Sequence, residues 1–303
     1  MTTQCTICPR HCPVDRTNNE LGFCGLPAGI FVSSRIIHWG EEPCFTGTKG
    51  VGNFFFTSCN LTCVYCQNYQ ISQMQKGNQK ISTEEFVESA LAFQSQGVHF
   101  VGLVTPSHQS PWIRKALKQA INQGFNTPII YNSSGYDSIE ELKKWEGLIH
   151  VYLPDLKYAT NSNGKKYSHV NNYETVSKNV ILEMYRQVGD IQIHPDTGIA
   201  KKGLWVRHLV LPNQIAGTWE SLCFLSLEVS KKIGLSLMAQ YTPMNQTHQF
   251  PELNRKIQQT EYNDALRMAV DLGFTEIQTQ VLSDASFYGI PNFDSDNPFQ
   301  VYS

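Results

Sequence analysis

Between residues 51 and 281 the chain alternates short apolar runs with amphipathic stretches, and this alternation limits its fold more than any other feature. The apolar runs predict strands at 54–56, 100–104, 128–131, 148–153, 204–211, 235–241 and 277–281. Helices are predicted at about 82–97, 110–124, 138–145, 173–188, 218–233 and 261–272. This spacing indicates parallel strands with right-handed crossovers. We therefore expect an α/β fold with a partial or near-complete parallel β/α barrel; a doubly wound sheet is the alternative.

Two stretches lie outside this alternation and suggest a division of the chain into three parts. Residues 1–50 are loop-rich and carry cysteines, so we interpret them as an N-terminal extension with a possible metal site. Residues 51–282 would form the barrel. Residues 283–303 are predicted to pack along the barrel as a C-terminal strap, because they carry the aromatic residues Phe287, Tyr288, Phe293 and Phe299.

The composition of the chain limits the classes of binding partner and the cellular compartment that we expect. The 303 residues have a net charge of −2 and no block of Lys and Arg, so we expect neither nucleic acid nor a membrane surface as a partner. The first residues show no export signal, and no apolar run is long enough to span a membrane, so we expect a cytoplasmic protein. Without export signals, the nine cysteines predict reduced metal ligands rather than disulfides.

Three of these cysteines, Cys59, Cys63 and Cys66, follow the first predicted strand in a C-x3-C-x2-C pattern. Three thiolates this close can hold three irons of a [4Fe-4S] cluster and leave the fourth iron open. S-adenosylmethionine (SAM) can chelate an open iron, and an electron from the cluster can then break a carbon–sulfur bond. Tyr65, next to Cys66, is placed to pack on the adenine. Unrelated buried cysteines or half of a zinc site are the alternatives.

Further polar residues lie within, near the end of or directly after the other predicted strands, toward the end where β/α barrels place their functional groups. These candidates are Thr105, Asn132, Ser134, Asp155, Lys157, Arg207 and Gln240. Arg207 lies within an apolar strand and needs an anionic partner, either the SAM carboxylate or an acidic side chain. Asp155 and Lys157 can face the same side of a strand and could serve the active site or form a buried ion pair. His108, His194 and His208 are proton-donor or ligand candidates, although a single histidine is more often structural.

The cysteine motif and its surroundings resemble the radical SAM superfamily, in the branch related to the pyruvate formate-lyase activating enzyme. The similar segments are Glu41–Pro43, Phe55–Tyr69, Leu103–His108, Tyr131–Asp137, Tyr152–Tyr158 and Val206–Pro212. The resemblance implies a radical SAM barrel, a SAM cofactor and one [4Fe-4S] cluster.

The resemblance also implies roles for single residues. Asp155 and Lys157 match an Asp-x-Lys pattern close to the active site, and Arg207 matches an arginine near the SAM carboxylate. Asn132 and Ser134 stand where the related enzymes have a turn near SAM. The Gly-Gly-Glu turn that binds the SAM amino group in those enzymes is replaced by Thr105-Pro106-Ser107, so the Thr105 hydroxyl or backbone carbonyls would have to accept that group.

The remaining cysteines include a second group near the N-terminus. Cys5, Cys8, Cys12 and Cys24 could close a tetrahedral zinc site or hold a second iron–sulfur cluster. We favour iron–sulfur because an electron relay suits radical chemistry, and a metal-free extension is the alternative. Cys44 and Cys223 are predicted to be small buried hydrophobic residues.

The predicted activity is the reductive cleavage of SAM to methionine and a 5′-deoxyadenosyl radical that takes a hydrogen from a substrate. The resemblance implies a glycine of a glycyl radical enzyme as the substrate, with flavodoxin or ferredoxin as the reductant. A small molecule or another macromolecule is the second hypothesis. A non-catalytic Fe–S sensor or carrier is the third.

Overall fold

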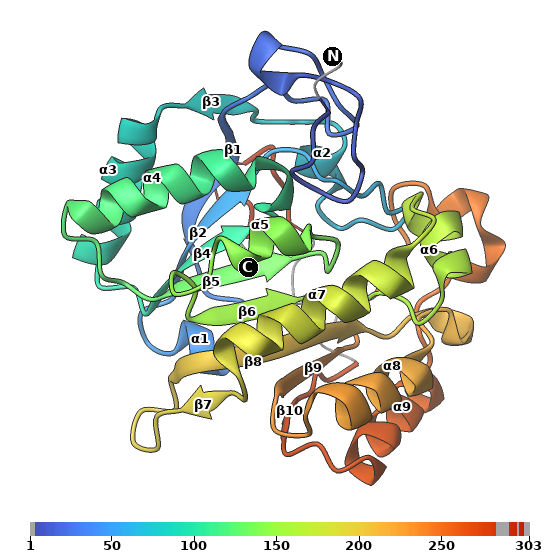
Figure 1. Cartoon of the computed structure of the whole chain (residues 1–303). Coiled ribbons are helices and arrows are strands. Elements are labelled where there is room, and N and C mark those ends of the chain that lie inside the picture. Colours follow the sequence, from blue (N-terminus) through green and yellow to red (C-terminus); the bar gives the residue numbers. More distant parts are fainter. Residues whose placement is uncertain (1–3, 283–290, 296, 300–303) are drawn as a thin grey trace.

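The computed structural model describes residues 4–282, 291–295 and 297–299 (Figure 1). Its largest feature is a run of seven parallel strands, each paired with the next one named: β2 (Val51–Phe56), β4 (Phe100–Val104), β5 (Ile129–Ser133), β6 (Val151–Pro154), β8 (Ala200–Leu209), β9 (Gly234–Met238) and β10 (Glu276–Gln278). The spatial order is the chain order. A doubly wound sheet would reverse its order at a switch point, so the sheet is a partial barrel, as expected.

Three strands that the sequence analysis missed extend the sheet. β1 (Ile30–His38) pairs antiparallel with β2, and β3 (Gln79–Ile81) pairs antiparallel with β1. β7 (Gln192–Ile193) pairs antiparallel with β8. Because β1 belongs to this sheet, residues 30–38, which the sequence analysis assigned to the N-terminal extension, are part of the barrel architecture.

The helices follow the predicted alternation. They are α3 (Thr83–Ser95), α4 (Ser110–Asn122), α5 (Ile139–Lys143), α7 (Tyr173–Val188), α8 (Thr218–Phe224) and α9 (Gln259–Asp271), with the shorter α1 (Pro43–Thr46), α2 (Tyr69–Ser72) and α6 (Asn161–Ser168). Among the described residues, five 3-10 turns span Arg16–Asn18, Ser107–Gln109, Pro212–Gln214, Thr247–Gln249 and Pro251–Leu253. A π-helical turn, Leu225–Val229, continues α8. The predicted capping box between Ser82 and Glu85 opens α3. No helix in the described part of the chain is long and apolar enough to cross a membrane.

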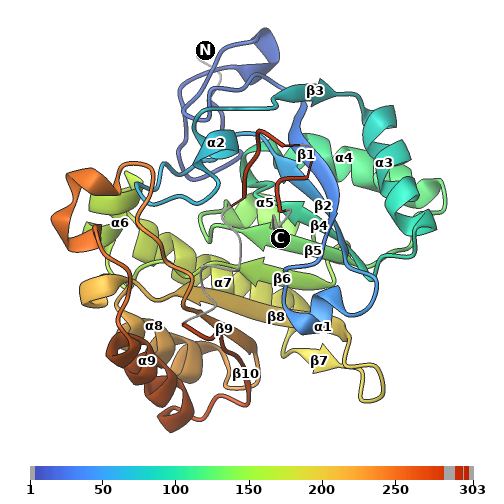
Figure 2. The same ribbon diagram turned by 180° about the vertical axis from the view of Figure 1, so that it is seen from behind.

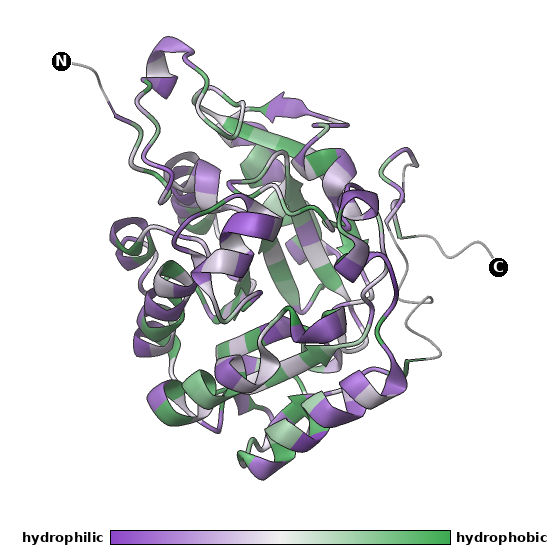
Figure 3. Ribbon diagram, turned by 90° about the vertical axis from the view of Figure 1, so that its right-hand side faces the viewer, coloured by the Kyte–Doolittle hydropathy of each residue, from purple (hydrophilic) through white to green (hydrophobic). Residues whose placement is uncertain are grey.

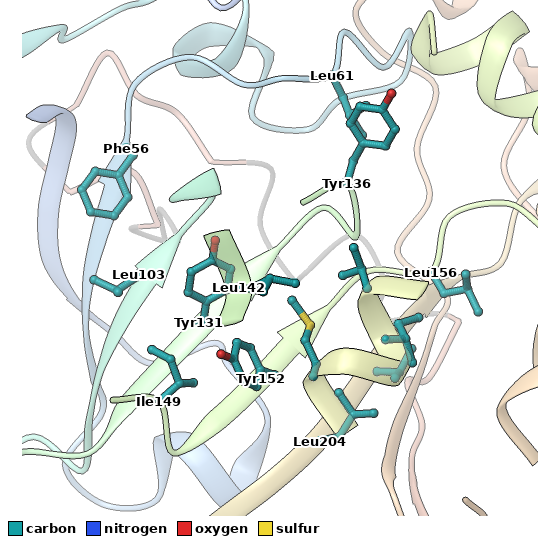
Figure 4. Close-up of a cluster of buried hydrophobic side chains, with 14 of the residues drawn as sticks. Phe56, Leu61, Leu103, Tyr131, Tyr136, Leu142, Ile149, Tyr152, Leu156 and Leu204 are labelled. Carbon is teal, nitrogen blue, oxygen red and sulfur yellow. The ribbon is translucent and has the colours of Figure 1, made fainter. Parts of the chain in front are cut away.

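Alternate residues of each strand point to opposite faces of the sheet. One set packs under the long helices: Leu103, Tyr131, Tyr152 and Leu204 from four neighbouring strands lie in one core with helix residues such as Leu142 (Figure 4). The strands in the middle of the molecule are accordingly mostly apolar, whereas the outer helices show polar faces (Figure 3).

The other set of strand residues faces the inside of the barrel, and α1 lies among them. Phe45 of α1 is fully buried and packs edge-on against Phe100 and Trp205. Its cluster also contains residues from the amino-terminal parts of β2, β5 and β6. The segment between β1 and β2 therefore fills the barrel at the amino-terminal ends of its strands.

The described part of the C-terminal tail lies across the open face of the sheet, near α2, β1 and β2 (Figure 2). The rings of Phe293 and Phe299 contact Phe55 of β2 at centroid distances of 5.7 and 5.4 Å. Lys76 and Asp294 form an ion pair of 2.6 Å. These described residues pack on the barrel. The strap over 283–303 as a whole stays a prediction, and Phe287 and Tyr288, named in it, lie outside the described residues.

Candidate active site

The three motif cysteines lie on the loop that leaves the carboxyl end of β2. Ser58 has a φ of 71°, and this left-handed residue turns the chain away from the strand directly before Cys59. The loop is fixed from the far side by α6, since the Val64 amide donates to the Tyr167 carbonyl at 2.9 Å. The Ser168 hydroxyl donates to the Cys63 sulfur at 2.9 Å.

The other two motif thiols have local partners. The Leu61 amide donates to the Cys59 sulfur at 3.3 Å, and the Cys66 sulfur lies 3.3 Å from the Ser72 hydroxyl of α2. Burial raises the pKa of Cys66 to about 11 and also raises the pKa values of the other two thiols. Metal binding therefore has to displace protons. Within the described residues, no three Cys, His, Asp or Glu side chains already form a metal-ion cage.

Lys157 is the cation beneath this loop. Its ammonium group lies 2.6 Å from the Asp155 carboxylate, so the predicted Asp155–Lys157 pair exists as an ion pair. Burial lowers the pKa of Lys157, but Asp155, Cys63 and Tyr173 together raise that pKa well above its usual value. The charge of Lys157 acts on all three motif thiols and offsets part of the rise in pKa that burial causes. A direct catalytic role of the pair stays a prediction.

A cavity of about 820 Å³ opens beside the loop. Gln67 and Asn68, directly after Cys66, form part of its wall. Inward-facing strand residues supply another part: Phe55, Val104, Asn132, Arg207, Ser236 and Met238. The described tail contributes Pro291, Asn297 and Phe299. The cavity thus connects the cysteine loop with the interior of the barrel above α1.

Arg207 binds two carboxylates in this cavity. Its Nε and Nη2 donate to Glu42 at 2.8 and 2.6 Å, and Nη2 also donates to Glu41. Burial raises the pKa of Glu41, but Arg207, His38 and Asn53 together hold that pKa below its usual value. Of the two partners considered from the sequence, the structure therefore shows the acidic side chains; contact with a SAM carboxylate stays a prediction.

Neighbouring strands hold the two glutamates in place. Asn53 of β2 donates to Glu41 at 2.7 Å, and Ser236 of β9 donates to Glu42 at 2.7 Å. Gly102 of β4 leaves the space for Asn53, since a Cβ there would lie 1.9 Å from the Asn53 side-chain oxygen. The Glu41–Glu42–Arg207 network is thus held by residues of the three strands β2, β8 and β9 and of the segment before α1.

Gln240 belongs to a chain of glutamines at the cavity wall. It donates to Gln67 at 3.0 Å and accepts from Gln280 at 2.9 Å. Gln67 in turn donates to the Gln240 carbonyl at 3.1 Å. The chain connects the cysteine loop to the ends of β9 and β10. Sequence reasoning selected Gln240 but missed Gln67 and Gln280, which carry no recognisable motif of their own beyond the position of Gln67 after Cys66.

The remaining predicted cofactor contacts lie near the same strand ends. Thr105 has a φ of 59°, a left-handed conformation that costs a β-branched residue roughly 1–2 kcal/mol. Its amide donates to the carbonyl of Asn132 at 2.8 Å. The buried Ser134 hydroxyl has no hydrogen-bond partner among the described residues. Tyr65 is 5% exposed and packs on Tyr158 and Tyr241. Contacts of these residues with SAM stay predictions.

His208 is a buried residue with two neutral partners. Its Nδ1 lies 2.7 Å from the Leu156 carbonyl, and its Nε2 lies 3.0 Å from the Thr218 hydroxyl. A neutral imidazole that donates from Nδ1 and accepts at Nε2 satisfies both contacts. Burial lowers the pKa of His208 to about 4. These contacts assign His208 a structural role.

We expect this histidine to make the fold less stable in mild acid. The unfolded chain takes up a proton near pH 6.5, whereas the folded chain resists it down to about pH 4, so stability falls as the pH drops through that range. The loss between pH 7 and pH 5 should be on the order of 1–2 kcal/mol. Urea unfolding at several pH values should show a weaker dependence for His208→Asn, whereas the exposed His248→Asn should keep it. An unchanged dependence in His208→Asn would contradict the assignment.

The N-terminal cysteines gather in one region. The Cys5 amide donates to the Cys12 carbonyl at 2.9 Å, and the Cys12 sulfur accepts from the Phe23 amide at 3.3 Å. Burial raises the pKa of Cys8 to about 12, and the thiols of Cys24, Cys5 and Cys12 raise it further. The four thiols are therefore electrostatic neighbours, which is compatible with a shared site.

Comparison with known proteins agrees with this geometry. Residues 53–198, which include the cysteine loop and the strands β4 to β6, match the model of the radical SAM superfamily. The chain carries a radical SAM domain. An uncharacterized protein of Methanocaldococcus jannaschii is 28% identical over 277 residues, which cover 88% of this chain and 74% of that protein.

Solved structures show a similar fold. SuiB of Streptococcus suis matches 74% of this chain and 47% of its own, with a TM-score of 0.51 and 11% identity, which shows likeness of fold alone. The chain thus spans about half the length of SuiB. A domain of a pyruvate-formate lyase-activating enzyme from Bacteroides vulgatus matches 57% of this chain and 91% of its own, at 11% identity. Its TM-score of 0.41 is too low to support a functional conclusion.

The radical SAM family implies a [4Fe-4S] cluster and SAM, and the residues of this domain fit both. Three thiols on one loop can hold three irons and leave one open. Lys157 supplies a positive charge that favours thiolates. The unpartnered Ser134 hydroxyl leaves a hydrogen-bonding group free for a bound molecule.

Proposed function

We propose that the protein is an enzyme that reductively cleaves SAM at a [4Fe-4S] cluster held by Cys59, Cys63 and Cys66. The observation that carries the proposal is the three-thiol loop at a strand end, with Lys157 beneath it and the cavity beside it. When bound, the cluster would give one electron to SAM, which breaks the C5′–S bond to methionine and a 5′-deoxyadenosyl radical. Flavodoxin or ferredoxin is the proposed electron donor.

The substrate is proposed to lie in the cavity and to give up a hydrogen atom there. Its volume of about 820 Å³ falls within the range of roughly 300–1,000 Å³ that is usual for small-molecule pockets. Phe299 forms part of its wall and packs on Phe55, so an inserted peptide loop would have to displace the tail. These features favour a small molecule. The glycine of a glycyl radical enzyme is the second candidate, supported by the motif resemblance.

One experiment separates the two substrate classes. An anaerobic extract of the source cell is divided by ultrafiltration, and each fraction is added to the reconstituted enzyme with SAM and a reductant. We expect the low-molecular-weight fraction to raise 5′-deoxyadenosine formation several-fold above the substrate-free rate. A glycyl radical signal by electron paramagnetic resonance (EPR) in the protein fraction, without stimulation by the small molecules, would contradict this and favour the activating-enzyme function.

We further propose that Cys5, Cys8, Cys12 and Cys24 hold one metal centre. Four thiols that interact electrostatically within 20 residues support it. Four thiolates suit either an iron–sulfur cluster or a tetrahedral zinc ion, and we favour iron–sulfur because electrons have to reach the SAM cluster. The metal content of a variant without the motif cysteines, described in the Discussion, tests this site.

A further inference from the structure

The N-terminal cysteine segment forms hydrogen bonds with the loop of Cys59, Cys63 and Cys66, both before and after Cys59. Before it, the Ser58 hydroxyl donates to the Cys24 carbonyl at 2.5 Å. After it, the Nε of Arg10 donates to the Asn60 carbonyl at 2.8 Å. Contacts across 34 and 50 residues of sequence hold the two cysteine groups together. The extension is therefore built into the active site.

Arg10 is the charged residue at this junction. Its guanidinium lies 3.5 Å from the ring centroid of Phe23, and its Nη1 donates to the His169 carbonyl at 2.8 Å. These contacts fix the plane and the position of the group. It interacts electrostatically with the thiols of Cys8, Cys12 and Cys59, one from the cluster loop and two from the extension.

One nitrogen of Arg10 has no acceptor. Its Nη2 is buried and makes no hydrogen bond among the described residues. A buried donor without an acceptor is destabilising, and more so when it is charged. An iron–sulfur cluster next to Arg10 would provide sulfur acceptors and negative charge.

We propose, resting on the function proposed above, that Arg10 is a positioning residue that raises the reduction potential of the cluster at Cys59, Cys63 and Cys66. A cluster becomes more negative when it is reduced, so a fixed cation and N–H donor beside it stabilise the reduced state more than the oxidised one. Through Arg10, the cysteine-rich extension makes the electron transfer that starts the reaction more favourable.

The test measures the potential of the reconstituted full-length protein by an EPR-monitored redox titration. The signal that changes on addition of SAM identifies the cluster at the motif cysteines. Arg10→Gln removes the charge, Arg10→Lys keeps it, and Arg35→Gln is the control, because Arg35 is exposed and bonds Ser89 away from the loop. We expect Arg10→Gln to shift the reduction equilibrium about tenfold against the reduced cluster, which is about 59 mV for one electron. Arg10→Lys should recover most of that shift, and Arg35→Gln should cause none.

Each other outcome has a definite meaning. A potential in Arg10→Gln equal to that of the wild type overturns the proposal, and so does an equal shift in Arg10→Gln and Arg10→Lys. If Arg10→Gln takes up too little iron, the decision rests on Arg10→Lys: wild-type iron content and potential support the charge role, and loss of iron shows a merely structural contact. Absence of any SAM-responsive signal in the wild type rejects the proposed function itself.

Discussion

Replacing Cys59, Cys63 and Cys66 together with Ala should abolish 5′-deoxyadenosine formation and remove the SAM-responsive cluster. The expected loss is complete, because no other thiol of the described residues lies on this loop. Iron and sulfide analysis after anaerobic reconstitution measures the cluster, and chromatography of the quenched reaction measures the product. Undiminished 5′-deoxyadenosine from the triple variant would reject the assigned ligands.

The same variant tests the N-terminal thiols, since it retains Cys5, Cys8, Cys12 and Cys24. We expect it to keep stoichiometric iron with sulfide, or zinc in their place. If it holds neither, the N-terminal metal centre does not exist. Cys223→Ala is the matched control: it lies on α8 and should leave both metal content and product formation unchanged.

Replacing Arg207 with Ala should destabilise the fold by about 3–5 kcal/mol, because it leaves two buried carboxylates without their cation. The side chains of Glu41 and Glu42 are only 8% and 5% exposed, and Arg207 pairs with both. Urea unfolding measures the change. Adding Glu41→Gln and Glu42→Gln should recover much of the loss, since the uncompensated charges are then gone.

The stability difference between the wild type and Arg207→Ala should also depend on pH. In the wild type the pKa of Glu41 is lower in the folded protein than in the unfolded chain. The stability that the Arg207–Glu41 pair contributes is therefore fully present above the pKa of Glu41 in the unfolded chain. It is lost as the pH falls through the pKa of Glu41 in the folded protein. Without Arg207, burial should raise that pKa instead, so the difference between the two proteins should shrink in acid. Arg186→Ala, which breaks the pairs of an exposed arginine with Glu146 and Glu183, should cost much less stability. Equal costs for the two arginines would contradict the buried network.

Arg207 also tests the predicted contact with SAM. If the guanidinium holds the SAM carboxylate in addition to the two glutamates, its removal should weaken SAM binding by tens-fold while leaving the iron content intact, because losing one partner of a desolvated charge pair costs on the order of 2–5 kcal/mol. Unchanged SAM affinity in a folded Arg207→Ala protein would limit the residue to its structural role.

The helices and strands that local sequence patterns determine could be predicted from the sequence. β4 and α7 have the predicted bounds, because an apolar run and a 3.6-residue period require no distant partner. α6 was missed, since its sequence, Asn161–Ser168, contains a glycine and has few apolar residues. It forms nonetheless through contacts with the cysteine loop and α7. β1 and β3 were missed because these antiparallel strands lie outside the strand–helix alternation.

The site was predictable from residue types but not from their pairings. The cysteine spacing indicated the cluster loop, and the charge of Arg207 in an apolar strand indicated a buried anionic partner. That Glu41 and Glu42 supply it could not be read from the sequence, since the contacts span 165 and 166 residues. Gln280 and Arg10 were missed for the same reason: each becomes significant only where the fold places it against a distant loop.

The central claim is tested most directly by one anaerobic measurement on the wild-type protein. The reconstituted enzyme is reduced in the presence of SAM, and 5′-deoxyadenosine and methionine are quantified together. Reductive cleavage predicts both products in equal amounts, with none before the reductant is added. A reduced, iron-loaded protein that leaves SAM intact would contradict the enzymatic function and favour the Fe–S sensor or carrier.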